Sequence, residues 1–122
     1  MLVDSHALLW FVAGDSRRIG RDLRARVEAE ATSVSAASLW EIAIKVSLGK
    51  LDAPEDLPDR VQDLGFELLP ITPEHVWRVR QLPFHHRDPF DRLLIAQAQE
   101  QRLPIVTADP AFDAYDVAVV WE

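Results

Sequence analysis

The chain is 122 residues long, the size of one domain, and its hydrophobic content of 48% excludes a disordered tail. It contains no cysteine, which excludes a disulfide framework and a thiolate metal site. A net charge of −7 excludes nucleic-acid binding through bulk electrostatics, so such a role needs a local basic patch or a metal ion that reverses the local sign.

We expect neither export nor membrane association. The aspartate at position 4 comes too early for the apolar core of a secretory signal, and no apolar run approaches membrane-spanning length. These features predict a cytoplasmic protein in which residues 1–122 form a single domain.

The first half of the chain alternates apolar strands with helical patterns. Residues 1–3 have no polar side chain, which predicts a strand at the centre of a sheet. The predicted elements that follow are a helix over residues 5–13, a helix over 21–31, a strand over 32–34, and a helix from Ser35 or Ser38 to residue 48.

The second half continues the same alternation. The predicted elements are a linker over residues 50–58, a short helix over 59–64, a strand over 66–71, a helix over 72–82, a helix from Asp88 to about residue 98, a strand over 104–107, a turn or short helix over 110–115, and a strand over 117–120. This alternation predicts an α/β fold, a three-layer α/β/α domain around a central, mostly parallel sheet.

The helix that ends near residue 48 has more apolar positions than one buried face requires. Its predicted core-facing stripe comprises Leu39, Ile42, Ala43 and Val46. We expect its other face to be covered as well, because it carries Trp40, Ile44 and Leu48. Together with the apolar helices over 5–13 and 72–82, this excess predicts a two-fold homodimer.

The helix that begins near residue 88 has carboxylates in its first turn. Asp88 suits the N-cap and Pro89 the first helical position, so Asp91 falls in the first turn. A doubled cap with favourable dipole charge is the simpler interpretation of this stretch alone. The other acids along the chain favour a metal or ligand site instead.

Four acids are expected to face one cleft at the carboxyl edge of the sheet, where sites form in open parallel sheets. Asp4 follows the first strand, Asp109 follows the strand over 104–107, Asp91 begins the preceding helix, and Glu41 lies in the helix after the second strand. Such a cluster does not ionise without cost. With oxygen ligands only and no histidine at ligand spacing, Mg²⁺ or Mn²⁺ is the natural occupant, which points to phosphodiester hydrolysis.

Each acid also has a purely structural interpretation. Asp4 can cap the helix that follows it, and Asp109 begins a common Asp-Pro turn dipeptide. Glu41 can pair with Lys45 or complete a capping box with Ser38. All of these would have to hold together for the cluster to be empty, so the sequence favours a metal site.

The roles of the neighbouring basic residues stay open. His85 and His86 can form a metal or phosphate site beside Arg87, although such a loop pair is more often solvated. Arg87 and Arg92 can hold phosphates or pair with local acids. The four tryptophans are expected in the core or at an interface rather than as platforms for stacked bases.

Four motifs, in this order, resemble those of the PIN-domain ribonucleases, and among them the VapC-like toxins of bacterial toxin–antitoxin pairs. They are Leu-Val-Asp-Ser-His-Ala-Leu-Leu-Trp from residue 2, Ser-Ala-Ala-Ser-Leu-Trp-Glu-Ile-Ala-Ile-Lys from residue 35, His-Arg-Asp-Pro-Phe-Asp-Arg-Leu-Leu-Ile-Ala-Gln-Ala from residue 86, and Ile-Val-Thr-Ala-Asp from residue 105. Each motif alone is weak, but together they span nearly the whole chain and are specific.

The resemblance implies a PIN fold, Mg²⁺- or Mn²⁺-dependent endoribonuclease activity on RNA, a homodimer and a small VapB-like antitoxin. By motif position, Asp4, Glu41, Asp91 and Asp109 take the places of the family's acidic residues. Asp88 fits the pattern less well than Asp91 and is a second choice, and Asp113 is left outside the site. An antitoxin that covers these acids should offer a basic side chain, and arginine matches carboxylate geometry best.

Two other functions remain open. A catalytically inactive PIN-like domain that only binds a partner would keep the fold, although the presence of all four acids argues against it. A receiver-type phosphoacceptor domain is also a small acidic α/β protein, but it requires paired acids after its first strand and a lysine near its end. Here Ser5 follows Asp4, and no lysine follows Lys50.

Overall fold

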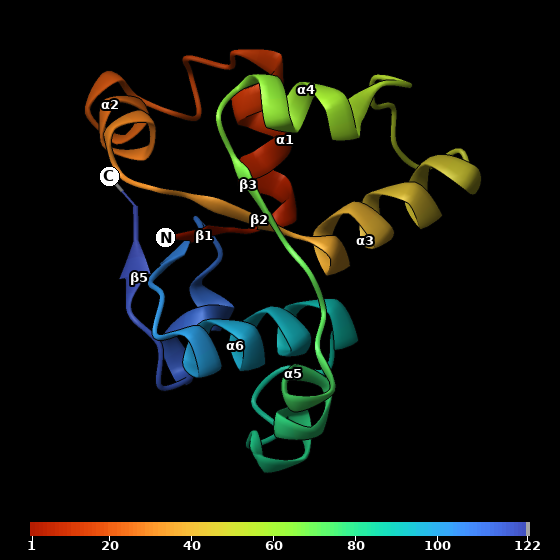
Figure 1. Ribbon diagram of the computed structural model, residues 1–122, viewed down its shortest axis with the longest axis vertical. Coiled ribbons are helices and arrows are strands. Elements are labelled where there is room, and N and C mark those ends of the chain that lie inside the picture. The colour runs from red at the N-terminus through yellow and green to blue at the C-terminus, as the bar shows by residue number, and fades with distance from the viewer. Residues whose placement is uncertain (122) are drawn as a thin grey trace.

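A five-stranded parallel sheet lies at the centre of the structure, a computed structural model that describes residues 1–121 (Figure 1). The strands are β1 (Leu2–Val3), β2 (Ser33–Ser35), β3 (Glu67–Leu69), β4 (Ile105–Val106) and β5 (Val119–Val120). Their order is β3-β2-β1-β4-β5, and every neighbouring pair is parallel. The predicted parallel α/β architecture is confirmed, with β1 as the central strand.

Within residues 1–121, six α-helices and two 3₁₀ segments connect the strands. They are α1 (Ser5–Ala13), α2 (Arg21–Ala29), α3 (Ala36–Ser47), α4 (Leu57–Asp63), α5 (Pro73–Arg78), η1 (Val79–Gln81), α6 (Pro89–Gln101) and η2 (Pro110–Ala114). The predicted helix over 72–82 is α5 followed by the tighter η1, which ends shortly before Pro83. Among residues 1–121, no helix is both long and apolar enough to cross a membrane.

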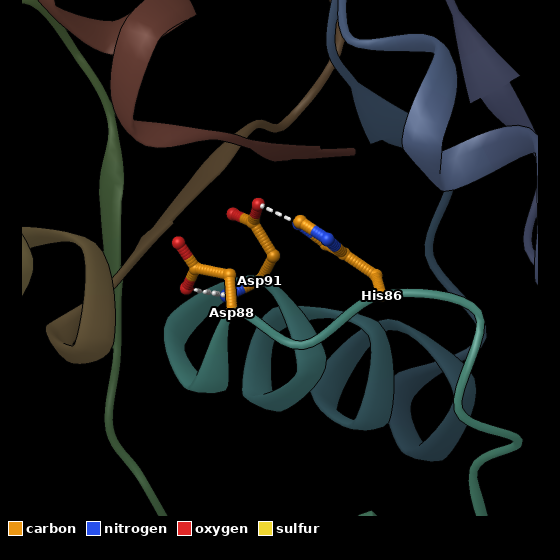
Figure 2. A group of neighbouring side chains, drawn as sticks. All are labelled: His86, Asp88 and Asp91. Atoms are coloured by element: carbon orange, nitrogen blue, oxygen red, sulfur yellow. Dashed lines mark hydrogen bonds and ion pairs between the residues drawn. The ribbon is translucent and has the colours of Figure 1, made fainter.

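Side-chain caps fix where α6 and α5, among other helices, begin. Asp88 accepts hydrogen bonds from the backbone N–H groups of Phe90 and Asp91, so it is the N-cap of α6 as predicted (Figure 2). Thr72 caps α5 in the same way by accepting from the His75 N–H, and the His75 ring accepts from the Thr72 N–H in return. These starts are local in sequence, which is why the sequence alone could place them.

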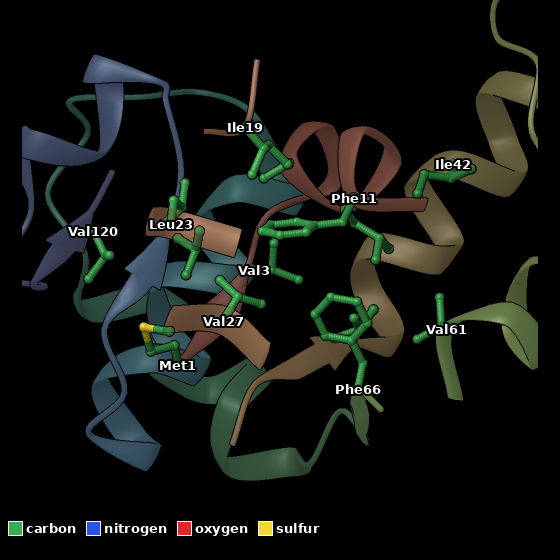
Figure 3. Packing of buried hydrophobic residues seen from close by; sticks show 14 of the residues in the cluster. Met1, Val3, Phe11, Ile19, Leu23, Val27, Ile42, Val61, Phe66 and Val120 are labelled. Carbon is green, nitrogen blue, oxygen red and sulfur yellow. The ribbon is translucent and has the colours of Figure 1, made fainter. Parts of the chain in front are cut away.

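The two residues of β1 point to opposite faces of the sheet and enter two separate apolar cores. Val3 packs in a cluster with residues of α1, α2 and α4, which lie on one side of the sheet (Figures 1 and 3). Leu2 packs in a second cluster with residues of α6 and η2 on the other side. Both side chains have no exposed surface, so β1 is buried on both faces between layers of helices.

The predicted buried face of α3 is correct for Ile42 and for Leu39, which packs against the cluster that contains Val3, and wrong for its other two residues. The residues of this helix that are buried are Ala37, Ser38, Glu41 and Ile42, whereas Ala43 and Val46 are exposed. Trp40 is 57% and Leu48 61% exposed, so the opposite face is not covered either. The periodicity of apolar residues failed here because the structure turns a carboxylate, Glu41, inward and leaves apolar side chains outside.

Arg92 holds the segment between α5 and α6 against the second core. It is 6% exposed, and its guanidinium donates to the backbone carbonyls of Val79, Leu82, Pro83 and His86 and to the Tyr115 hydroxyl. The Phe84 ring lies over the guanidinium, 4.4 Å from ring centroid to Cζ. The guanidinium of Arg92 is therefore occupied by structural hydrogen bonds, and it forms no ion pair with an acid among residues 1–121.

We expect Arg92→Lys to destabilise the fold by about 2–4 kcal/mol, because an ammonium group cannot reach several carbonyls at once and stays buried. Urea unfolding measures this difference. Arg87→Lys, at an exposed position of the same segment, is the control and should change stability by less than about 0.5 kcal/mol. Equal effects of the two substitutions would contradict the role assigned to Arg92.

Candidate functional site

Asp4 sits at the carboxyl end of β1 and is held by two hydrogen bonds. One carboxylate oxygen accepts from the Ala7 N–H at 2.9 Å, so Asp4 does cap α1. The other oxygen accepts from the Thr107 hydroxyl. Asp4 is only 4% exposed, and a cap alone does not require such burial.

Thr107 links the ends of the two central strands and was not identified from the sequence. Its hydroxyl donates to Asp4 and accepts from the Asp109 N–H at 3.0 Å. Because β1 and β4 are neighbours in the sheet, this side chain holds the two aspartate-bearing turns together. The only local signal was a hydroxyl residue directly after the apolar strand Ile105–Val106.

Asp109 keeps the turn role that its sequence predicted. Its carboxylate accepts from the Ala111 N–H at 2.9 Å and caps η2, and the residue is half-buried. The pKa of Asp4 is raised mainly by burial, and the negative charge of Asp109 adds to this shift. The two aspartates at the ends of neighbouring strands therefore feel one another electrostatically.

Glu41 is buried and satisfied by donors from two helices. Its carboxylate accepts from the Ser5 hydroxyl at 2.6 Å and from the Lys45 ammonium at 3.1 Å. The predicted pairing with Lys45 is confirmed, whereas the capping box with Ser38 is not formed, because Ser35 is the N-cap of α3. Ser5 directly follows Asp4, so the start of α1 positions both acids.

Asp91 lies in the first turn of α6 and faces His86. The Nε2 atom of His86 is 2.7 Å from an oxygen of the Asp91 carboxylate, and the two side chains point toward one another in Figure 2. His86 is thus half-buried against an acid, and the expectation that both histidines are solvated holds only for His85. The backbone of His86 is itself fixed, because its N–H donates to the Tyr115 hydroxyl and its carbonyl accepts from Arg92.

Burial makes two of these carboxyls hard to ionise. Together with the negative charges of Asp88 and Glu41, it raises the pKa of Asp91 from 3.8 to about 6 despite the hydrogen bond from His86. Burial likewise raises the pKa of Asp4, against the hydrogen bonds from Thr107 and Ala7. Charge at this edge of the sheet is therefore only partly compensated by the residues around it.

The predicted acids approach one another in pairs rather than as one tight group. Asp4 feels Asp109 across the strand ends, and Asp91 feels Glu41 across α6 and α3. Within residues 1–121, the residues whose ligand atoms all lie within 4.8 Å of one another are His86, Asp88 and Asp91. This group thus combines an imidazole nitrogen with carboxylate oxygens, whereas the sequence predicted a metal site with oxygen ligands alone.

Two hollows flank the start of α1. One, of about 240 Å³, is lined by Ser5, Glu41 and Lys45 among others, and the other, of about 370 Å³, is lined by Asp4 and Asp109. His6 lines both.

The donors around these hollows suit a divalent cation. Carboxylate oxygens are the ligands that Mg²⁺ prefers, and Mn²⁺ also accepts imidazole nitrogen. A cation would also stabilise the ionised carboxylates of Asp4 and Asp91, whose pKa values are raised mainly by burial and further by neighbouring negative charges.

Solved structures with the same fold include several toxin–antitoxin complexes. VapBC2 from Rickettsia felis, bound to a DNA fragment from their promoter, matches with a TM-score of 0.73 at 12% identity over 98% of this chain and 96% of that one. DNA-bound VapBC from Salmonella typhimurium matches with 0.73 at 16% identity over 98% and 95%. A toxin–antitoxin complex from Klebsiella pneumoniae matches with 0.66 at 19% identity over 98% and 95%. At these identities the likeness establishes a common fold.

The family assignment rests on the sequence itself. No curated protein matches the chain significantly. The family model of the PIN domain, however, matches residues 1–118, which is nearly the whole chain. The three-layer α/β/α arrangement around a parallel sheet agrees with that match, and we conclude that the chain belongs to the PIN domain family.

Proposed function

We propose that this chain is a VapC-like toxin, a metal-dependent endoribonuclease that hydrolyses phosphodiester bonds of RNA. The observation that carries the proposal is the burial of Asp4 and Glu41 at the carboxyl edge of the sheet of a PIN domain, with Asp109 and Asp91 near enough to repel them. Buried acids whose charge is not compensated are costly unless a cation binds there.

In this proposal Asp4, Glu41, Asp91 and Asp109 would hold Mg²⁺ or Mn²⁺. When bound, such an ion polarises a phosphoryl oxygen and lowers the pKa of water. The chain's other residues orient the acids. Thr107 fixes one oxygen of Asp4, Ser5 and Lys45 fix Glu41, and His86 fixes one oxygen of Asp91.

The other functions considered from the sequence are less well supported. The PIN family match over residues 1–118 argues against a receiver-type phosphoacceptor domain. All four predicted acids are present, which argues against an inactive PIN-like binding domain.

We propose that the protein acts in the cytoplasm, where a nuclease of this kind would damage its host unless restrained. The solved neighbours from Rickettsia felis and Salmonella typhimurium are VapBC proteins, which supports a VapB-like antitoxin as the partner here. We propose that the antitoxin places an arginine among the acids, because its planar fork matches carboxylates.

We also propose a homodimer. Trp40 and Leu48 on α3 are 57% and 61% exposed, and Val76 and Trp77 on α5 are 55% and 66% exposed. Both helices pack against α6, so these side chains flank the same element. Exposed apolar residues concentrated on two neighbouring helices typically mark an interface.

Asp91→Asn should lower metal-dependent RNA cleavage by more than roughly 100-fold with the fold intact, since even residues behind a metal ligand contribute about 10- to 100-fold. The measurement is cleavage of total RNA with Mg²⁺ or Mn²⁺, with the new ends mapped. Asp113→Asn, at an exposed acid of η2, is the matched control and should cleave as the wild type does. Wild-type rates in Asp91→Asn would remove Asp91 from the site.

The stability of the metal-free protein should depend on the ionisation of Asp91. The pKa of its carboxyl is raised to about 6 from 3.8, so the stabilisation by the neutral carboxyl is complete below about pH 3.8 and is lost as pH rises through 6. This shift corresponds to at most about 3 kcal/mol.

In EDTA, Asp91→Asn should therefore become more stable than the wild type between pH 4 and pH 6, and keep its advantage of about 1–3 kcal/mol above pH 6. Thermal unfolding at a series of pH values measures this, and saturating Mn²⁺ should reverse the order by binding the folded wild type. A stability difference that does not change with pH would show that Asp91 ionises freely.

Expression of the chain alone should slow growth, and co-expression of the small open reading frame beside its gene should restore growth. The purified pair should form a complex that no longer cleaves RNA. A harmless chain whose purified form still cuts RNA, or a neighbour that fails to bind it, would refute the antitoxin proposal.

Static light scattering at micromolar concentration should give the mass of a dimer. Trp40→Glu should give a monomer, because a charge in the centre of an apolar interface is costly to bury. Leu64→Glu, at a 50% exposed position after α4, should remain dimeric. A monomeric wild type rules the interface out.

A further inference from the structure

We propose that the hollow beside Asp4 and Asp109 is a subsite for one nucleobase of single-stranded RNA, with Trp10 and His6 as its stacking residues. The inference rests on the proposed ribonuclease function, because it places a base of the same strand whose phosphodiester lies at the acids. It also departs from the sequence analysis, which expected all four tryptophans in the core or at an interface.

The hollow combines two kinds of surface. Its volume is about 370 Å³, and its lining comprises Asp4, His6, Trp10, Ala108, Asp109 and Pro110. The two acids belong to the site already described, and the other four residues are aromatic or small. Ligand pockets with an apolar lining and a few polar groups begin at roughly this size.

Two rings stand along one face of α1 at this hollow. His6 and Trp10 are four residues apart, which brings their side chains next to one another on a helix. Their ring centroids are 6.3 Å apart with the planes tilted by 35°. His6 is exposed and Trp10 half-buried, so both are accessible from the hollow that they line.

The Trp10 ring is held in place before any ligand arrives. Trp121 packs edge-on against it, with centroids 5.9 Å apart, and the Arg18 guanidinium carbon lies 5.0 Å from the ring centroid. The side chain of Arg18 is 59% exposed and forms an ion pair with Asp15, with 3.4 Å between Nε and the carboxylate oxygen. A fixed indole with a cation beside it is the arrangement that single-stranded nucleic-acid sites use for stacking.

A nucleobase fits this surface better than a peptide segment does. With a net charge of −7, the protein cannot gain affinity for RNA from bulk charge, whereas stacking does not depend on net charge. In an RNA strand whose phosphate lies at Asp4 and Asp109, the nearest base is joined to that phosphate through a single ribose. Both the acids and the aromatic rings line the same hollow. Single-stranded RNA is recognised by aromatic stacking of this kind.

Abasic substitution tests the subsite. The probe is an RNA oligonucleotide that the wild type cleaves at one bond with Mn²⁺, remade with a single abasic ribose at each position around that bond. Stacking contributes roughly 1–3 kcal/mol per base, or about 5- to 150-fold. At one position next to the cleaved bond we expect the wild-type KM to rise within this range, with a smaller change in kcat.

The variants show whether Trp10 and that base act together. Trp10→Ala should raise the KM for the intact oligonucleotide and then respond little to the abasic position, whereas Trp10→Phe should keep most of the wild-type response. Leu64→Ala, at an exposed apolar side chain outside the hollow, is the control and should respond as the wild type does. Should Trp10→Ala fail to fold, Trp10→Phe and the exposed-site variant His6→Ala carry the test, and His6→Ala should show a reduced response.

The outcomes separate the subsite from the function beneath it. Independent effects of the base and of the variants, in a protein that cleaves RNA, overturn the subsite alone. The same result combined with lost antitoxin binding in Trp10→Ala assigns the hollow to a protein partner and also overturns it. A wild type that cleaves no RNA with Mg²⁺ or Mn²⁺ overturns both the proposed function and the subsite.

Discussion

The candidate site depends on the burial of carboxylates at the end of a strand that is itself fully buried. Leu2 and Val3 leave no room for polar groups in the middle of the sheet, so the first polar residue, Asp4, comes at its carboxyl edge. There its buried carboxylate accepts hydrogen bonds from the Ala7 N–H and the Thr107 hydroxyl instead of from water. A buried acid with only neutral donors still resists ionisation, as its raised pKa shows.

The sheet order brings chemically related residues to this edge from distant parts of the chain. β1 lies between β2, which leads into α3 and Glu41, and β4, which leads into Thr107 and Asp109. α6 packs against α3 and adds Asp91. On the far side of α6, Arg92 anchors the preceding segment, and that segment carries His86 to Asp91. The order of the strands therefore also determines which charged side chains meet at the carboxyl edge of the sheet.

The features that the sequence could predict were those set by neighbouring residues. The apolar run of β1 and the caps Asp88 and Thr72 act over a few positions, and they were placed correctly. The acids were identified because each ends a strand or begins a helix.

Contacts between distant residues were beyond the sequence. The hydrogen bond between Thr107 and Asp4 joins residues that are 103 positions apart in the sequence, and the residues around each of them do not indicate the contact. Arg92 has backbone carbonyls as its main partners, and these leave no mark in the sequence. The inward face of α3 was not predicted in full, because periodicity identifies only apolar positions. Glu41 is polar, and hydrogen bonds from Ser5 and Lys45 make its burial possible.

The central claim is that the four acids, rather than the His86, Asp88 and Asp91 group alone, bind the cation. Anomalous diffraction from a crystal soaked in Mn²⁺ tests it most directly, because it locates the ion independently of activity. The account predicts an anomalous peak in contact with Asp4 or Glu41 as well as Asp91. A peak bound only by His86 and Asp88, or no peak at these acids in a protein that cleaves RNA, would contradict it.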